Sequence, residues 1–506
     1  MVVTPSAMQE LERRAFAQGA SAEELMDEAG AGTACAVRQF HPEPGTCLVV
    51  FGKGHNGGDA LVAARHLAIA GWETFLLPAA PEEQWSELTR KKFGEAGLCR
   101  LFEPAEEDWA AVLKRTRCSG TGPIVVLDGL LGVGATGLLR GILTDLTQRM
   151  NALRETAHAH VVAIDLPTGL DGDTGAPVPD CVVADLTVTI GFAKRGLLAD
   201  GASNFVGRLV VLPLAALTAQ AAGAQPDETV AYPEMLAPLL ARRAFESHKG
   251  IYGRIAIVAG SRGFTGAALL CSAGCVRAGA GLISLYVPED IYPIVAASAL
   301  PEVMVHPVRS YAEVLETKFD VLAIGPGLGH GKNEEVLDVL RRCDKPAILD
   351  ADALHILPES MDVLDAKRGP RLLTPHPGEM ERLDPFAKNQ TRRKTAERFV
   401  ARHGVTLLLK GARTVVAEHG RPLSFNSTGH PGMATGGMGD VLTGVCAALT
   451  GQGLALYDAA RVGAWLCGRA AELALSAGRE SQESLTPTAL LAHLGVAFRD
   501  LHERCY

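Results

Sequence analysis

Three observations predict an α/β fold arranged in two domains. Short apolar runs of strand length alternate with helical stretches along most of the chain, which is typical of parallel sheets covered by helices. The length of 506 residues exceeds what a single hydrophobic core usually spans. A stretch of small and polar residues, Leu214–Thr229, separates two series of apolar runs. We therefore expect a Rossmann-like three-layer sandwich over residues 1–221 and a second α/β domain over residues 222–506.

The first series begins after a helical segment. Apolar residues recur at helical spacing over Ser6–Phe40, and the stretch Ala60–Ala70 has the same spacing. The runs that predict strands are Thr46–Phe51, Ile124–Leu127, Val161–Ile164, Leu186–Ile190 and Leu209–Leu212. Their alternation with helices predicts a parallel, doubly wound sheet.

The second series has the same character but shares no repeated sequence with the first. Its predicted strands are Ile255–Ala259, Leu282–Val287, Val321–Ile324, Ala347–Leu349, Thr406–Leu409 and Thr414–Ala417. The two halves therefore share their class of fold and nothing more specific.

Composition limits the classes of function. Hydrophobic residues make up 47% of the chain and charged residues 21%, as in an ordinary globular protein. The formal net charge of -9 argues against nucleic-acid binding, and no run is long and apolar enough to span a membrane. The eleven cysteines contain no CxxC pair, so we expect reduced thiols in a cytoplasmic protein whose partners are small molecules.

Three predicted strands of the first domain end in polar or glycine-rich segments. The loop Gly52-Lys-Gly-His-Asn-Gly-Gly-Asp59 precedes a helix, Asp128 is followed by a loop rich in glycine, and Asp165 opens Asp-Leu-Pro-Thr-Gly-Leu-Asp171. A helix-capping aspartate would explain any one of them. Together they would meet at the carboxyl edge of one sheet, where open α/β folds bind ligands.

These segments, with Thr187-Val-Thr-Ile-Gly-Phe-Ala-Lys194, resemble the NAD(P)H-hydrate epimerase family over most of residues 1–215. The resemblance implies interconversion of the R and S forms of hydrated nicotinamide cofactor, with Asp165 as the acid–base group. It implies a potassium ion held by Asn56, Asp128 and Thr168. It implies that the hydrate contacts His55, Asn56, Gly57, Gly58, Asp59, Gly132, Val133, Gly134, Ala135, Thr136, Gly137, Leu138 and Asp165.

Two positions depart from that family. His55 stands where asparagine is usual, and Thr168 where serine is more common. Threonine keeps the hydroxyl, whereas imidazole lacks the paired donor and acceptor of an amide. A binding or oligomerisation module without catalysis is therefore an alternative for this domain. Lys194 is either a cation facing the substrate or a solvated surface lysine.

The second domain carries a longer glycine-rich segment, Asn426-Ser-Thr-Gly-His-Pro-Gly-Met-Ala-Thr-Gly-Gly-Met-Gly-Asp440. Backbone amides at a helix start can neutralise a moving phosphoryl group while an aspartate takes the proton of the accepting hydroxyl, which predicts Asp440 as a catalytic base. A simple helix cap is the alternative. Three further loops follow predicted strands, namely Gly325–Gly329, Thr374–Glu379 and Lys410–Thr414.

From His248 to Trp465 the chain resembles the ADP-dependent NAD(P)H-hydrate dehydratase family, which has a ribokinase-like fold. The resemblance implies that ADP phosphorylates the hydrate, that phosphate then leaves to regenerate NAD(P)H, and that magnesium accompanies the nucleotide. It implies hydrate contacts at Ala267, Gly327, His376 and Asp440. It implies nucleotide contacts at Lys410, Gly411, Ala412, Arg413, Thr414 and Gly439.

Together the two resemblances imply a bifunctional repair enzyme, expected as a homo-oligomer, that acts on hydrated NADH and NADPH with ADP. A ribokinase-like kinase that makes a stable phosphorylated vitamin precursor, joined to a binding domain, is the alternative. His376 is either a hydrate contact or a structural histidine. Asp350 and Asp352 are either metal ligands or groups that cap a helix or orient loops.

Overall fold

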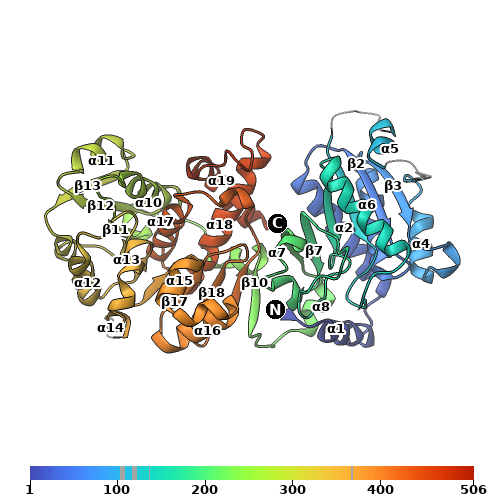
Figure 1. The fold of residues 1–506 in the computed structure, drawn as a ribbon, viewed down its shortest axis with the longest axis horizontal. Coiled ribbons are helices and arrows are strands. Elements are labelled where there is room, and N and C mark those ends of the chain that lie inside the picture. Colours follow the sequence, from blue (N-terminus) through green and yellow to red (C-terminus); the bar gives the residue numbers. More distant parts are fainter. Residues whose placement is uncertain (103–108, 117–121, 136, 366–367) are drawn as a thin grey trace. The chain divides into compact units, whose positions relative to one another are not determined.

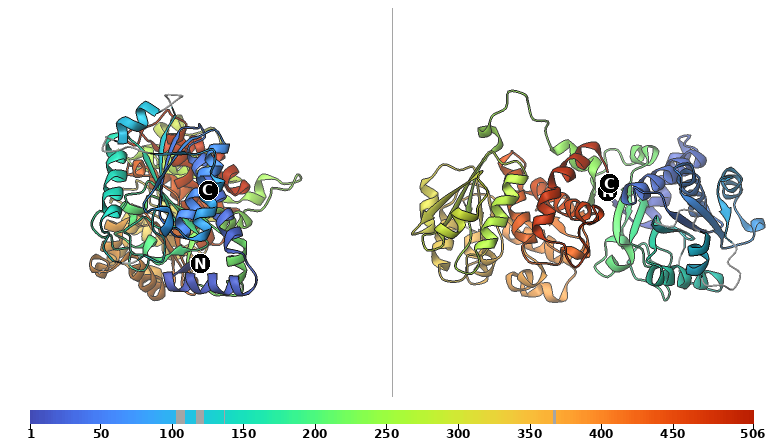
Figure 2. Two further views of the ribbon diagram at one scale, coloured as in Figure 1. Left: turned by 90° about the vertical axis from the view of Figure 1, so that its right-hand side faces the viewer. Right: turned by 90° about the horizontal axis from the view of Figure 1, so that it is seen from above.

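The computed structural model describes residues 1–102, 109–116, 122–135, 137–365 and 368–506. The chain divides into two compact units, Met1–Pro226 with Tyr506 (unit 1) and Asp227–Cys505 (unit 2). Each unit has its own large sheet with helices packed on it (Figures 1 and 2), so the predicted α/β class is confirmed.

Unit 1 is built on a seven-stranded sheet with the order β4-β3-β2-β5-β6-β7-β9, in which every described strand pair is parallel. Its strands are β2 (Thr46–Phe51), β3 (Glu73–Pro78), β4 (Arg100–Leu101), β5 (Ile124–Gly129), β6 (His160–Ile164), β7 (Leu186–Ile190) and β9 (Arg208–Leu212). A separate small sheet pairs β1 (Val2–Val3) with β8 (Ala193–Lys194).

Helices cover both faces of this sheet, because successive side chains of each strand point to opposite sides. In β2, Val49 and Phe51 pack in one core with α1, α2 and α3, whereas Leu48 and Val50 pack in another with α5 and α6. The helices of unit 1 are α1 (Pro5–Ala17), α2 (Ala22–Phe40), α3 (His55–Ile69), α4 (Glu87–Glu95), α5 (Trp109–Thr116), α6 (Ile142–Thr156), α7 (Ser203–Val206) and α8 (Ala215–Gln220), with 3₁₀ turns at Glu82–Gln84 and Arg195–Leu198.

Three details of unit 1 differ from the sequence prediction. The helical segment Ser6–Phe40 is two helices, because Gly19 takes a positive φ and Ser21 caps α2. Helix α3 begins at His55 rather than Ala60, so the motif His55–Asp59 forms its first turn. Strand β3, which opens with two polar residues, and the two-residue strands β1, β4 and β8 were not predicted.

Unit 2 contains a ten-stranded sheet with the order β10-β19-β18-β17-β16-β15-β14-β11-β12-β13, in which only β18 runs antiparallel to its neighbours among the described pairs. Its strands are β10 (Glu228–Ala231), β11 (Arg254–Val258), β12 (Leu282–Pro288), β13 (Val303–Val308), β14 (Val321–Ile324), β15 (Ala347–Leu349), β16 (Arg371–Leu373), β17 (Thr406–Leu409), β18 (Val415–Ala417) and β19 (Leu423–Asn426). All six strands predicted with bounds in this half are present, β16 is the strand expected before Thr374, and β10, β13 and β19 were not predicted.

One core of unit 2 joins one face of the sheet to α10, α17, α18 and α19, and includes Trp465. The helices of unit 2 are α9 (Pro233–Leu236), α10 (Thr265–Arg277), α11 (Tyr292–Ser298), α12 (Asn333–Arg342), α13 (Asp352–His355), α14 (Asp362–Asp365), α15 (Pro377–Leu383), α16 (Arg392–His403), α17 (Met438–Gly451), α18 (Leu456–Ser476) and α19 (Pro487–Glu503). The remaining 3₁₀ turns lie at Ala237–Leu239, Lys249–Tyr252, Tyr311–Glu316, Leu357–Glu359, Pro385–Asn389 and Pro431–Met433. Across the described ranges, none of the helices has the length and apolar character that a bilayer span requires.

Candidate active sites

In unit 1, the first turn of α3 lies against the end of β2 because glycines leave room for it. A Cβ atom at Gly57 would lie 2.0 Å from the Gly52 carbonyl oxygen, and a Cβ atom at Gly52 would lie 2.1 Å from the Leu130 carbonyl oxygen. No larger residue fits at either position without a backbone shift. The N-terminus of α3 is therefore held beside the loop that follows β5.

The three predicted potassium ligands are linked through that loop. Buried Asp128 accepts hydrogen bonds from the hydroxyl and from the backbone N–H of Thr168, each at 2.8 Å. The Leu131 N–H donates to the Thr168 hydroxyl at 3.2 Å, and the Leu131 carbonyl accepts from the Asn56 amide nitrogen at 3.0 Å. The Leu131 peptide thus connects Asn56 to the Asp128–Thr168 pair.

Two properties of this cluster suit a hard cation. The Asn56 Oδ1 atom is buried and has no hydrogen-bond partner among the described residues, although buried polar atoms are normally paired. Burial raises the pKa of Asp128 to about 6, against the hydrogen bonds from Thr168 and Leu130 that lower it. A cation beside these oxygens would satisfy the amide and favour the ionised carboxylate. The residues present therefore fit the implied ion.

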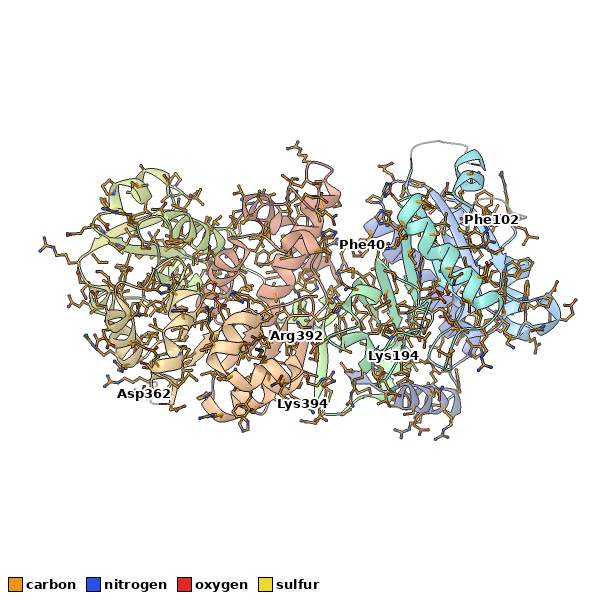
Figure 3. The ribbon with its side chains drawn as sticks, in the orientation of Figure 1. Phe40, Phe102, Lys194, Asp362, Arg392 and Lys394 are labelled. Atoms are coloured by element: carbon orange, nitrogen blue, oxygen red, sulfur yellow. The ribbon has the colours of Figure 1, made fainter. Side chains whose placement is uncertain are left out.

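A buried ion pair lies at the end of the neighbouring strand. Asp165 follows β6 with a φ of 67°, and its Oδ1 accepts hydrogen bonds from the Lys194 ammonium and from the Ile190 N–H, the latter at 3.1 Å. Lys194, labelled in Figure 3, also donates to the Ile190 carbonyl at 2.9 Å. Its side chain is fully buried. The interpretation of Lys194 as a solvated surface lysine is therefore wrong.

Asp59, in the first turn of α3, is electrostatically coupled to this pair. Burial raises the pKa of the Asp59 carboxyl well above its usual range, and the Asp165 carboxylate raises it further, whereas the Lys194 ammonium opposes the shift. A carboxyl group with a raised pKa beside an ion-paired carboxylate suits a site that exchanges protons.

Gly57 and Gly58 are buried in the first turn of α3, whereas the predicted hydrate contacts at His55 and after β5 are more exposed. Gly132 adjoins the Asn56 side chain, since a Cβ there would lie 3.5 Å from Asn56 Cβ. His55 is exposed, and the exposed stretch after Val133 comprises Gly134, Ala135, Gly137 and Leu138. Thr136 lies outside the described residues. The structure thus gathers the asparagine, aspartates and threonine of the motif and leaves His55 at the surface.

In unit 2, Asp440 stands in the first turn of α17. The helix begins after Gly437, whose φ is 92°, and no side chain caps its N-terminus. Burial raises the pKa of Asp440 to about 7, and the carboxylates of Asp350 and Asp352 add to the shift while the Lys410 ammonium opposes it. A base with this pKa can accept a proton near neutral pH, beside amides that suit an anion.

Asp350 connects this helix to three strand ends. It follows β15 and accepts hydrogen bonds from Lys410 after β17 at 2.7 Å, from Thr374 after β16 at 2.8 Å and from Thr443 of α17 at 2.8 Å. Burial alone would raise its pKa, but the Lys410 ammonium and these hydrogen bonds hold the pKa of Asp350 below its usual range. A Cβ atom at Gly439 would lie 2.9 Å from the Lys410 Nζ atom, so glycine lets α17 approach the pair.

Asp350 and Asp352 therefore orient protein groups. The Asp352 carboxylate accepts from the Gly329 N–H at 2.8 Å, which fixes the loop after β14. No group of three or more histidine, cysteine, aspartate or glutamate side chains suited to a metal ion occurs within the described ranges.

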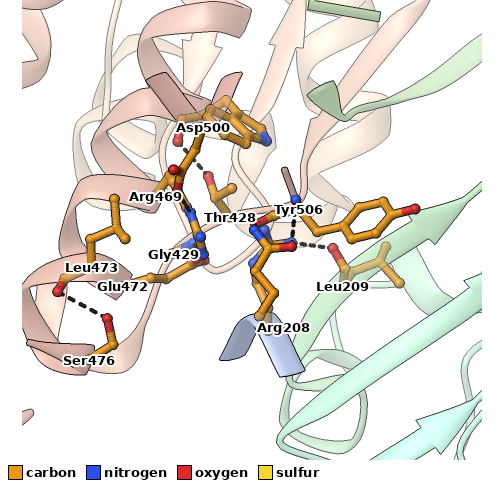
Figure 4. Close-up of polar contacts among 12 residues, drawn as sticks. Arg208, Leu209, Thr428, Gly429, Arg469, Glu472, Leu473, Ser476, Asp500 and Tyr506 are labelled. Atoms are coloured by element: carbon orange, nitrogen blue, oxygen red, sulfur yellow. Dashed lines mark hydrogen bonds and ion pairs between the residues drawn. The ribbon is translucent and has the colours of Figure 1, made fainter. Parts of the chain in front are cut away.

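The glycine-rich segment before α17 is anchored to α18. The Gly429 N–H donates to the Glu472 carboxylate at 2.8 Å, and the Thr428 hydroxyl donates to the Trp465 carbonyl at 2.9 Å (Figure 4). These hydrogen bonds hold the start of the segment against α18, while residues 434–436 are exposed.

The predicted hydrate contacts of unit 2 other than Asp440 lie on three segments, which are the first turn of α10, the loop after β14 and the residue that caps α15. Ala267 and Gly327 are adjacent, because a Cβ at Gly327 would lie 2.9 Å from the Ala267 Cβ atom. His376 caps α15, where its Nδ1 atom accepts from the N–H groups of Gly378 at 3.1 Å and Glu379 at 3.3 Å. The cap uses Nδ1, and Nε2 of His376 lies 3.5 Å from a carboxylate oxygen of Glu379.

The predicted nucleotide segment forms a turn between β17 and β18. The Thr414 hydroxyl donates to the Gly411 carbonyl at 3.1 Å, and Arg392 donates to the Arg413 carbonyl at 3.0 Å. Ala412 is exposed, whereas Arg413 is buried, so its guanidinium does not form part of an open nucleotide surface.

Sequence reasoning did not identify the partners of these groups. The Lys194–Asp165 and Lys410–Asp350 pairs, and the threonines Thr374 and Thr443, depend on contacts between distant segments. Apart from Thr443, which lies in α17, their only sequence signal is a position at or near the end of a strand.

Known proteins resemble both units. A family model described as NAD(P)H-hydrate dehydratase matches residues 255–493, and one described as YjeF-related protein N-terminus matches residues 22–196. A solved ADP/ATP-dependent NAD(P)H-hydrate dehydratase from Bacillus subtilis, co-crystallised with ATP and Mg²⁺, is 30% identical, with a TM-score of 0.47, and covers 55% of this chain and 100% of that chain.

Longer relatives span both units. The bifunctional NAD(P)H-hydrate repair enzyme of Moorella thermoacetica is 37% identical over 479 residues, which cover 90% of this chain and 88% of that protein. The enzyme of the same name from Escherichia coli is 36% identical over 464 residues, which cover 89% and 85%. Because such relatives match this chain over 85% or more of their own length, the chain belongs to the family of bifunctional NAD(P)H-hydrate repair enzymes.

Proposed function

We propose that this chain repairs hydrated NADH and NADPH, with epimerisation in residues 1–221 and dehydration of the S form in residues 222–506. The observation that carries the proposal is the match to bifunctional relatives across both units. The epimerase would convert the R hydrate into the S hydrate that the dehydratase consumes.

For the dehydratase, Asp440 would take the proton of the ring hydroxyl as its oxygen bonds to the terminal phosphorus of ADP and AMP departs. The ring-nitrogen lone pair would then expel phosphate, and loss of a proton from the adjacent ring carbon would restore the double bond. The raised pKa of Asp440 and the uncapped N-terminus of α17 support these roles. Lys410, Gly411, Ala412, Thr414 and the backbone of Arg413 and Gly439 would hold the nucleotide.

Magnesium would enter with the nucleotide and neutralise phosphate charge. Asp350 and Asp352 are occupied by protein donors, which supports placing the metal on the phosphates rather than on a carboxylate cluster. Ala267, Gly327 and Nε2 of His376 would line the hydrate pocket.

For the epimerase, Asp165 would act as the acid–base group, since its carboxylate is paired with Lys194 and lies near Asp59. Asn56 Oδ1, Asp128 and Thr168 would hold potassium, which would supply fixed positive charge beside the hydrate. The turn His55–Asp59 and the loop Gly132–Leu138 would contact the hydrate. We further propose that the protein is cytoplasmic and forms a homo-oligomer. Light scattering of the purified chain tests the oligomeric state.

The test is recovery of the near-ultraviolet absorbance of reduced nicotinamide from the separated R and S hydrates, with ADP or ATP and magnesium. Recovery from both epimers is expected. Recovery from the S hydrate alone would leave unit 1 as a binding module. A lasting phosphoester without recovered absorbance would replace the proposal with the small-molecule kinase alternative.

A further inference from the structure

The first turn of α3 is rich in glycine, so its own sequence gives it little stability. Gly54 stands at the N-cap, where it has no side chain to bond the helix, and Gly57 and Gly58 follow in the turn. Glycine is among the least favourable residues inside a helix. The turn nevertheless carries Asn56 and Asp59, so contacts from elsewhere in unit 1 decide where these two side chains lie.

Helix α4 supplies such contacts at its N-terminus. The Thr89 hydroxyl donates to the Gly54 carbonyl at 3.0 Å and lies 3.3 Å from the Lys53 carbonyl. The Lys53 carbonyl also accepts from the Ser86 N–H at 2.9 Å. The Gly54 carbonyl is the oxygen that accepts the first hydrogen bond of α3, from the Gly58 N–H at 3.2 Å. Thr89 therefore holds the peptide group from which α3 starts.

Ser86 fixes the direction in which Thr89 donates. Thr89 is completely buried, and its hydroxyl oxygen lies 2.7 Å from that of Ser86. A hydroxyl has one proton to give, and Thr89 gives its proton to the loop, so Ser86 is the donor between the two hydroxyls. The Thr89 N–H in turn donates to the Ser86 oxygen at 3.0 Å. Linked hydrogen bonds of this kind strengthen one another.

Helix α4 is itself fixed to the core of unit 1. The rings of Trp85 and Phe93 lie 4.9 Å apart, and Trp85 contacts Phe51, the last residue of β2, at 5.2 Å between ring centroids. The buried Lys92 ammonium donates to the Asp27 carboxylate of α2 at 3.0 Å. A donor on an element held in this way can set the position of the glycine-rich turn.

We propose that Thr89 is a positioning residue of the unit 1 site, which acts through the Gly54 carbonyl to place the Asn56 side chain for potassium and the hydrate. The proposal rests on the proposed epimerase function and its potassium site. It follows from the hydrogen bonds that join α4 to the start of α3. Because Asp165 follows a different strand, β6, the loss of the Thr89 hydroxyl weakens binding more than it slows proton transfer.

The test compares Thr89→Val with Thr147→Val in the full chain, since valine keeps the size of threonine and removes the hydroxyl. Thr147 is also completely buried and donates to the Thr144 carbonyl at 3.1 Å. It lies in α6, which packs on the opposite face of the sheet from α3.

Thr89→Val is expected to raise two quantities roughly fivefold to tenfold, which is the effect of one lost hydrogen bond. They are the epimerisation KM for the hydrate and the potassium concentration that gives half the maximal rate. The epimerisation kcat should fall by less than about threefold. Thr89→Ser keeps the hydroxyl and should restore both quantities, and Thr147→Val should change neither.

A second readout is independent of turnover. In the full chain with ¹⁵N-labelled asparagine, potassium should shift the side-chain amide resonance of Asn56, which is identified by its absence in Asn56→Leu. Thr89→Val should need roughly fivefold to tenfold more potassium for half of the shift, and Thr147→Val no more than the wild type. An unmoved midpoint together with an unmoved KM would overturn the proposal, as would a loss that Thr89→Ser does not restore.

The outcomes separate this proposal from the proposed function. If the wild-type chain does not epimerise the hydrate but the Asn56 titration still depends on the Thr89 hydroxyl, the proposed function fails and the positioning role stands. If the wild type epimerises the hydrate and Thr89→Val behaves like Thr147→Val, the positioning role fails. If Thr89→Val does not fold, Thr89→Ala removes the same hydroxyl and is judged by the same two measurements.

Discussion

Both units bury a lysine–carboxylate pair beside a further aspartate whose pKa is raised, but the two pairs face their surroundings in opposite ways. In unit 1 the Lys194 side chain is 1% exposed and the Asp165 side chain 10%. In unit 2 the Lys410 side chain is 21% exposed and the Asp350 side chain 2%. The accessible member is a carboxylate in one unit, suited to proton transfer, and an ammonium in the other, suited to phosphate.

The largest expected effect separates the two sites. Asp440→Asn removes the base of unit 2, so dehydration of the S hydrate should fall about 10²- to 10⁴-fold, while epimerisation keeps its rate. Asp165→Asn should have the converse effect. Rates of both reactions in each variant measure this, and a joint loss in either variant would mean that the sites are not independent.

Replacing each lysine by methionine tests which member of each pair faces the ligand. Lys410→Met should raise KM for ADP about 10- to 100-fold, the value of a charged hydrogen bond, and leave epimerisation unchanged. Lys194→Met should instead lower the epimerisation kcat with a smaller change in KM, because the lysine is covered. Steady-state kinetics of both reactions provide the measurement, and a lowered kcat with an unchanged KM for ADP in Lys410→Met would refute the contrast.

The pH dependence of the dehydration rate should report the effect of the Asp350 charge on Asp440. Since the base acts ionised and the pKa of Asp440 is raised to about 7, the dehydration rate should rise with pH up to about 7 and then level. Asp350→Asn removes a repelling charge and frees Lys410, so the limb should move to lower pH by about one unit. Asp352→Asn is the matched control and should move the same limb by a smaller amount in the same direction. Equal shifts in the two variants would show that the Asp350–Lys410 pair affects the pKa of Asp440 no more than Asp352 does.

Potassium should stabilise unit 1 in a pH-dependent way. The raised pKa of Asp128, about 6, means that the folded state holds this proton more tightly than the unfolded chain, so its contribution to stability falls as pH rises from about 4 to about 6. Potassium binds the ionised carboxylate. Above that pH window, potassium at a hundredfold excess over its dissociation constant should therefore raise the free energy of unfolding by about 2.7 kcal/mol. Below the window the increase should be smaller. Thermal unfolding with potassium or a bulky organic cation at two pH values measures this, and Asn56→Leu should abolish the difference.

The smallest effect is expected at His55. Because this side chain is exposed at the start of α3, His55→Asn should change the epimerisation kcat/KM by less than about twofold. A tenfold gain would show instead that the usual asparagine contacts the hydrate and that this chain has lost part of its epimerase site.

The sequence predicted the features that depend on residues close together in the chain. The strands with continuous apolar runs, such as β2 and β5, are present where expected, and Asp128 and Asp440 lie at the predicted strand end and helix start. The start of α3 was misplaced because Gly57 and Gly58 weaken the helix signal, while close packing against β2 favours a helix there. Neither Lys194 nor Asp350 could be assigned a partner, because their contacts join segments that only the folded chain brings together.

The pairing of β1 with β8 has a consequence for how unit 1 matures. Val3 and Lys194 lie almost a whole unit apart in sequence, so their contact is among the most non-local strand contacts of unit 1. The seven-stranded sheet does not require it. A protease that trims the first strand would therefore leave a folded unit 1 that has lost the support of its lysine, and amide exchange at Val3 would report on the competence of the site before exchange in the main sheet does.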